Sequence, residues 1–106
     1  MRATAWSNGS AVGSAYGIRI SASDRDAYFK HRWTEIVLEL PAGFGEAVVP
    51  LADAFWRQCS ELRSAEVGRW FRDSGLAPWP KGDPPVLSLQ QVSDNRFSVT
   101  SRRLQG

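Results

Sequence analysis

Apolar and polar residues alternate in several stretches of this sequence, and a period of two residues is typical of half-buried strands. The clearest case is the segment in which Ile36, Leu38 and Leu40 share one face. Turn-forming residues separate the second stretch from the third and the fourth from the fifth, so two hairpins are expected. The five predicted strands are residues 16–20, 33–40, 46–49, 86–92 and 96–100.

The middle of the chain changes to a spacing of three and four residues, which is typical of an amphipathic helix. The apolar positions at this spacing are Leu51, Phe55, Cys59 and Leu62. They predict one helix over this segment, with Asp53 as its N-cap.

A second helix is predicted immediately after Ser64, a residue type that is favoured at the N-cap. Val67, Trp70 and Phe71 form its apolar stripe. Gly75 is placed to end it, because glycine adopts the left-handed conformation found after a helix.

Two segments lack either period. Residues 1–15 are rich in Ser, Gly and Ala, so we expect them to be loosely ordered. Residues 77–85 contain four prolines, which predict a stiff connector. A short turn is expected from Ser23 to Lys30. Residues 16–106 are therefore predicted to form a single α+β domain, with a mainly antiparallel sheet of about five strands and two helices packed on one of its faces.

The inward positions of these elements predict one hydrophobic core. A chain of 106 residues is long enough to bury such a core without disulfide bonds. The predicted core residues are Ile18, Ile20, Ile36, Leu38, Leu40, Phe55, Leu62, Val67, Trp70, Phe71, Leu89, Phe97 and Val99.

Composition and charge narrow the function classes. No apolar run approaches the roughly 20 residues that cross a bilayer, so no membrane association is expected. The single cysteine, Cys59, excludes an intramolecular disulfide and favours the cytoplasm. The basic residues are eleven Arg and two Lys, but eleven acids leave a net charge of only +2. This balance is not typical of a dedicated nucleic-acid-binding protein.

Few residues are suited to catalysis. One His and one Cys do not supply a zinc shell, so neither a metal nor a cofactor is predicted. Cys59 continues an apolar stripe and is expected to be a core cysteine, with a Cys–His pair to His31 as the alternative. Asp24 and Asp26 are expected to cap and balance a turn.

The aromatic content is the most unusual feature of the composition. Five Trp, two Tyr and five Phe exceed what the predicted core stripes hold. Trp33 falls on the strand face that carries acidic residues, Trp56 lies off the helix stripe, and Trp79 stands between two prolines. Aromatic residues and Arg are enriched in binding surfaces. The candidate binding residues are Trp33, Trp56, Trp79, Lys81, Arg25 and Arg96.

Several short motifs occur one after another along the chain. They are Gly17-Ile-Arg-Ile, Asp24-Arg25-Asp26, Tyr28-Phe29, Trp33, Phe55-Trp56, Cys59, Glu61-Leu62, Gly68-Arg69-Trp70, Pro78-Trp79-Pro80-Lys81-Gly82, Pro84-Pro85 and Asn95-Arg96-Phe97. This combination resembles a group of small uncharacterised bacterial proteins associated with mobile gene cassettes. The resemblance covers residues 6–99 and is strongest at the Pro-Trp-Pro-Lys-Gly element. It implies a free-standing bacterial protein, and it implies no activity.

The sequence therefore favours a non-enzymatic binding domain that associates with itself, most simply as a two-fold dimer, because large exposed aromatic surfaces associate. A protein or small-molecule partner is compatible with the same surface. The alternative is a nucleic-acid-binding module that uses aromatic stacking and arginines. The arginines proposed for it are Arg25, Arg32, Arg96, Arg102 and Arg103. An enzyme with a small-molecule cleft is the third hypothesis, and no catalytic set supports it.

Overall fold

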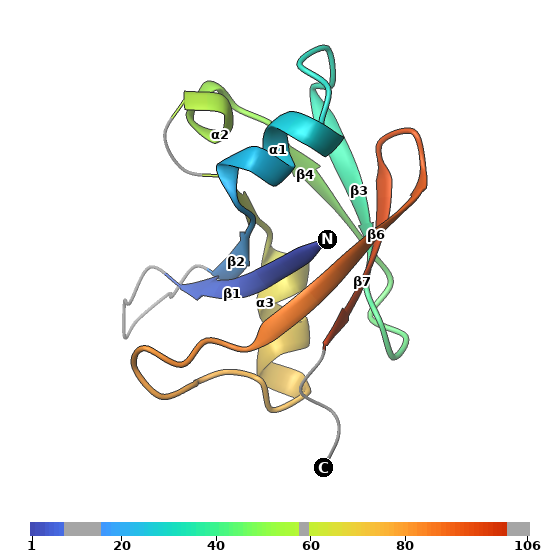
Figure 1. Ribbon diagram of the computed structural model, residues 1–106. Helices are drawn as coiled ribbons and strands as arrows, with labels where there is room; N and C mark the ends of the chain where they lie inside the picture. Colours follow the sequence, from blue (N-terminus) through green and yellow to red (C-terminus); the bar gives the residue numbers. More distant parts are fainter. Residues whose placement is uncertain (8–15, 58–59, 102–106) are drawn as a thin grey trace.

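Residues 1–7, 16–57 and 60–101 are the part of the chain that the structure, a computed structural model, describes, and they contain three helices and seven strands (Figure 1). The helices are α1 (Ala22–Tyr28), α2 (Asp53–Arg57) and α3 (Ala65–Asp73). The strands are β1 (Arg2–Ser7), β2 (Tyr16–Arg19), β3 (Glu35–Glu39), β4 (Glu46–Pro50), β5 (Glu61–Arg63), β6 (Val86–Ser93) and β7 (Arg96–Ser101).

The described strands form one sheet in the order β4-β3-β7-β6-β1-β2-β5. All neighbours are antiparallel except β3 and β7, which run parallel. The two edge strands, β4 and β5, approach each other, and α3 packs against β2 and β4. The sheet therefore curls into a nearly closed barrel (Figure 1). The α+β class is confirmed and the sheet is mainly antiparallel, but the predicted number of about five strands is wrong, because the described residues form seven.

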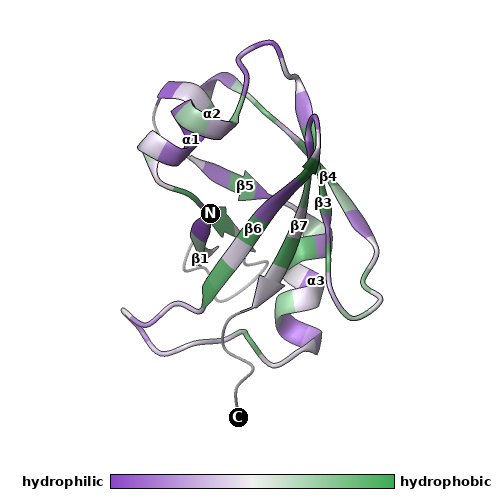
Figure 2. Ribbon diagram, turned by 45° about the vertical axis from the view of Figure 1, so that its right-hand side comes forward, coloured by the Kyte–Doolittle hydropathy of each residue, from purple (hydrophilic) through white to green (hydrophobic). Residues whose placement is uncertain are grey.

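The helices do not share one face of the sheet as predicted. In both ribbon views, α1 and α2 lie together at one end of the barrel, away from α3 (Figures 1 and 2). A hydrogen bond of 3.1 Å from Nη1 of Arg25 to the carbonyl oxygen of Phe55 joins α1 to α2. The segment predicted as a turn after Ser23 is the helix α1, which begins after its N-cap Ser21.

The first strand is the largest departure from the sequence prediction. Residues 1–15 were expected to be loose, yet Arg2–Ser7 forms β1 between β6 and β2. Its inward side chains are Ala3 and Ala5, which are 3% and 4% exposed. Alanine contributes little to a hydrophobic pattern, so the alternation of this strand is nearly invisible in the sequence. Residues 8–15 lie outside the described residues.

The helix predicted from Leu51 to Leu62 is also wrong in its second half. Helix α2 ends at Arg57, and Leu62 lies on β5, where it pairs with Ile18 of β2. A strand of three residues is too short to show a period of its own. Its one apolar residue, Leu62, also fits the helical spacing that starts at Leu51, and this explains the wrong prediction. Cys59 lies outside the described residues, and its predicted burial stays a prediction.

The remaining elements follow the sequence prediction. Both hairpins form, β3 with β4 and β6 with β7. The side chain of Ser64 caps α3, and Gly75 follows the helix with a φ of 82°. Every predicted core residue is buried. Figure 2 shows the alternation of hydrophobic and hydrophilic residues along the first half of β6. No helix of the described residues is long and apolar enough to cross a membrane.

Candidate functional site

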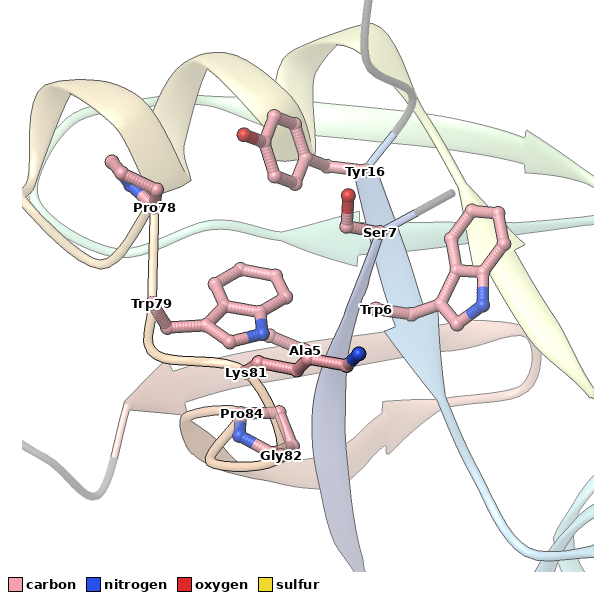
Figure 3. Close-up of a pocket in the computed structure, with 9 residues that line it drawn as sticks. All are labelled: Ala5, Trp6, Ser7, Tyr16, Pro78, Trp79, Lys81, Gly82 and Pro84. Carbon is pink, nitrogen blue, oxygen red and sulfur yellow. The ribbon is translucent and has the colours of Figure 1, made fainter. Parts of the chain in front are cut away.

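A cavity of about 400 Å³ lies between the end of β1 and the proline-rich connector that leads from α3 to β6 (Figure 3). Tyr16, Pro78 and Trp79 stand on one side of the strand end, and Trp6 stands on the other (Figure 3). The residues that line it are Ala5, Trp6, Ser7, Tyr16, Pro78, Trp79, Lys81, Gly82 and Pro84. We refer to this cavity as the aromatic pocket.

The pairing of three strands places one wall of the aromatic pocket. Trp6 of β1 lies directly opposite Gly17 of β2, and Gly17 lies opposite Arg63 of β5. Because Gly17 has no side chain, Arg63 reaches across β2, and its guanidinium carbon lies 4.5 Å from the centroid of the Trp6 ring. This cation–π contact covers one face of Trp6 and holds the ring beside the pocket.

The opposite wall is a group of aromatic rings in mutual contact. The Tyr16 and Trp79 centroids are 5.8 Å apart, and both rings lie 6.0 Å from that of Phe71, all three in edge-to-face geometry. Phe71 belongs to α3 and is fully buried. Edge-to-face contacts are the preferred arrangement of aromatic rings. The two outer rings are therefore fixed against the core, while they remain partly exposed at the cavity.

Helix α3 packs closely against this wall. Gly68 faces the Tyr16 ring, and a Cβ at Gly68 would lie 3.4 Å from Cδ2 of Tyr16. The guanidinium carbon of Arg72 lies 5.8 Å from the centroid of the same ring. The Tyr16 ring thus packs against the buried face of α3 at ordinary contact distance.

The connector closes the pocket on its third side. The amide N–H of Ala5 donates to the carbonyl oxygen of Pro85 at 2.9 Å, which joins the connector to β1. The amide of Asp83 donates to the carbonyl oxygen of Pro80 at 3.0 Å, and Gly82 has a φ of 82°. This turn carries the exposed Lys81, whose ammonium group points toward the Trp6 side of the cavity (Figure 3).

Two of the predicted binding residues, Trp79 and Lys81, therefore meet in the pocket. Trp79 also packs against the core cluster, so it covers the core edge and lines a cavity at the same time.

Trp33 does not lie on a binding surface. It is 7% exposed, because it lies just before β3 and its ring packs in edge-to-face geometry against the stacked rings of Phe29 and Phe97, at 5.9 and 6.3 Å between centroids. The prediction that Trp33 is exposed is wrong. The predicted strand began at Trp33, whereas β3 begins at Glu35, so Trp33 does not belong to the outward face of that strand. Its indole N–H is buried and has no hydrogen-bond partner among the described residues.

Trp56 is half-buried at the other end of the barrel. Its ring stacks on that of His31 with 3.9 Å between the centroids, and it meets Phe55 at 5.1 Å. The structure does not bring it together with Trp79, so the tryptophans predicted as anchors do not form one surface.

The predicted arginines are engaged within the protein. Arg25 binds Asp26 and the α2 carbonyl described above, with its side chain 13% exposed. Arg96 binds Glu39 at 3.0 Å and also Glu46. The hydrogen bond to Glu46, and then that to Glu39, raise the pKa of Arg96 above its ordinary value. Both arginines connect elements of the fold.

Trp6 and Tyr16 line the pocket but are not among the binding residues predicted from the sequence. Trp6 falls in the segment predicted to be loosely ordered, and Tyr16 is predicted only as the first residue of a strand. The signal that could have found Trp6 is its alternation with Ala3 and Ala5, which makes residues 3–6 a strand with one large outward side chain.

Among the described residues, no cluster of three or more His, Cys, Asp or Glu side chains is arranged to hold a metal ion. Comparison of the chain with protein-family models, with curated proteins and with solved structures gave no match. The resemblance to cassette-associated proteins stays a prediction.

Proposed function

We propose that this chain is a non-enzymatic binding domain that takes a small, planar, mainly apolar ligand in the aromatic pocket. The observation that carries this proposal is the rigid aromatic wall, in which Tyr16 and Trp79 are fixed by the buried Phe71 yet open to the cavity. Ligand sites are typically cavities of about 300–1,000 Å³ with mainly apolar walls and a few polar groups. The aromatic pocket fits that description in size and in lining.

The engagement of the arginines favours a small ligand over nucleic acid. Single-stranded nucleic acid needs a continuous groove of cations that follows its phosphates. Arg25 and Arg96 are tied into the fold, and Arg32 lies 3.6 Å from the carboxylate of Asp94. Arg102 and Arg103 lie outside the described residues. The nucleic-acid alternative therefore has less support than the pocket.

Self-association stays a prediction, and the tryptophans expected to anchor it do not form one surface. Trp33 lies in the core, and Trp56 and Trp79 lie in separate clusters. Among the described residues, the most exposed large apolar side chains are those of Tyr28, Val48 and Val92, at 46%, 55% and 54%. They come from three different elements, and ligand binding in the aromatic pocket does not depend on a second copy.

Calorimetric titration with 2-naphthalenemethanol, a neutral planar probe, tests the proposal. A probe of this size is expected to bind with a Kd on the order of 1 mM, given about 0.3 kcal/mol per heavy atom. Trp79→Ala removes part of the wall and should weaken binding at least tenfold. Trp56→Ala is the matched control, since it removes another half-buried tryptophan from the far end of the barrel.

Two results would contradict the proposal. One is the absence of any binding by the parent protein at millimolar probe. The other is an equal loss of affinity in both tryptophan variants while both remain folded by circular dichroism, because binding would then not take place in the aromatic pocket.

A further inference from the structure

The two ends of the aromatic pocket differ in character. The end formed by Tyr16, Pro78 and Trp79 is apolar and rests on the core. The end near Trp6 carries positive charge, because Lys81 lines the cavity and Arg63 lies 4.5 Å from the Trp6 ring. A ligand that fills the pocket therefore meets an apolar wall at one end and cations at the other.

The acids near the pocket do not cancel this charge. Glu61 binds Arg63 at 3.3 Å and also Arg19 at 2.6 Å, so one carboxylate is shared by two guanidinium groups. Its side chain is only 3% exposed, and Glu61 is not among the residues that line the aromatic pocket. Asp83 lies in the turn of Lys81 and has interactions of its own within the chain. Lys81 is the only ionisable residue other than Tyr16 among those described as lining the cavity.

Lys81 is also in a favourable position to meet a ligand. Its ammonium group points across the open cavity, while the aromatic rings exclude water from one side of any ligand held there (Figure 3). An ion pair beside an apolar surface is screened less than one in open water. Lys81 thus supplies a charge that discriminates between ligands of different sign.

We infer that the ligand is a planar aromatic molecule with an anionic group, such as a carboxylate, at one end. This inference rests on the proposed function of the aromatic pocket and adds the charge of its ligand. The flat ring packs on Trp79 and Tyr16, and the anionic group pairs with Lys81 near Trp6, with Arg63 adding to the positive potential.

A series of three probes of the same ring and different charge tests this inference: 2-naphthoate, 2-naphthalenemethanol and 2-naphthylmethylammonium. Calorimetric titration should show that the anion binds about fivefold more tightly than the alcohol, and that the cation binds most weakly. Raising the salt concentration should weaken binding of the anion and leave that of the alcohol unchanged.

Lys81→Met keeps the length of the side chain and removes its charge, so it should remove most of the preference for the anion. Lys30→Met is the matched control, because Lys30 is also exposed, lies 3.9 Å from the carboxylate of Asp94 and does not line the aromatic pocket. The control should keep the full preference. The salt dependence in the parent protein tests the same point without any substitution.

The outcomes separate the inference from the proposed function. If all three probes bind equally and Trp79→Ala still removes binding, the pocket binds planar ligands but the inference on charge is refuted. A preference for the cation refutes it as well. If no probe binds, both the inference and the proposed function fail.

Discussion

Gly17 is the residue on which the geometry around the pocket depends most directly, and Gly17→Ala is a single-methyl perturbation. A Cβ at this position would lie 2.7 Å from the carbonyl oxygen of Leu62 and 3.2 Å from the Cα of Arg63. Ordinary contacts of a Cβ begin near 3.4 Å, and the atoms in the way are backbone atoms of β5. The edge strand must therefore move away from β2 by several tenths of an ångström.

The expected cost follows from these contacts. Overpacking by one or two methyl groups costs about 1–3 kcal/mol, and displacement of Arg63 from Trp6 removes a cation–π contact of about 0.5–1 kcal/mol. The reduced freedom of the unfolded chain offsets about 0.4–1 kcal/mol of this loss. We expect Gly17→Ala to lower the free energy of unfolding by about 2 kcal/mol. In a domain of this size that is a fall in Tm of about 8–16 °C.

Urea unfolding, followed by tryptophan fluorescence and by circular dichroism, measures this loss. Gly68→Ala is the control, since its Cβ would lie 3.4 Å from the nearest side-chain atoms, an ordinary contact. Alanine is also favoured over glycine within a helix by up to about 1 kcal/mol. Gly68→Ala should therefore be neutral or stabilising. If Gly17→Ala unfolds within about 0.5 kcal/mol of the parent protein, the pairing of β2 with β5 is wrong.

Three further predictions concern the core, the cap of α3 and the oligomeric state. Trp70→Ala removes a side chain that is 2% exposed, so it should cost about 3–5 kcal/mol in thermal or urea unfolding; a Tm within two degrees of the parent would contradict the assignment of the helix face. Ser64→Ala should cost about 1 kcal/mol by removing the N-cap. The Ser64 hydroxyl donates to Oε1 of Glu66 at 2.8 Å and lowers the pKa of that carboxyl, so NMR titration should show this pKa rising in the variant. Because the folded pKa is the lower one, the parent gains stability above the ordinary pKa of Glu66 and loses it as the pH falls through the folded value; the variant should show a smaller loss. Sedimentation equilibrium at micromolar concentration tests the two-fold dimer, which predicts twice the chain mass of 11.8 kDa; a monomer mass at every concentration would contradict it.

The sequence predicted the parts of the fold whose side chains are large and regularly spaced. Ile36 and Leu38 alternate in β3, and Val67 and Trp70 follow the period of α3, so both elements and their buried faces were correct. These signals are local, because each element shows its own period within a few residues.

Two strands, β1 and β5, were not predicted from the sequence, and the reasons are physical. Strand β1 buries only alanines, and β5 is three residues long, so neither shows a clear period. The barrel closes through pairings between distant segments, such as β3 with β7 and β1 with β6. Such pairings depend on the whole arrangement, and no short window of sequence contains them.

The candidate site was predicted only in part, because it too combines residues that are distant in the sequence. Trp79 and Lys81 were selected from the local chemistry of one connector. Trp6 and Tyr16 join them only because β1 and β2 pair with each other, and both residues stand 63 or more positions before Trp79 in the sequence. Arg63 reaches Trp6 only because Gly17 separates them in the sheet.

The central claim is that the aromatic pocket binds a planar ligand, and a titration of the ¹⁵N-labelled protein with 2-naphthoate tests it most directly. The indole N–H resonances report on each tryptophan separately. The account predicts that the signals of Trp6 and Trp79 shift together with one Kd, whereas those of the buried Trp33 and Trp70 stay in place. Shifts confined to Trp56, or no shift at Trp6 and Trp79 at millimolar ligand, would contradict the account.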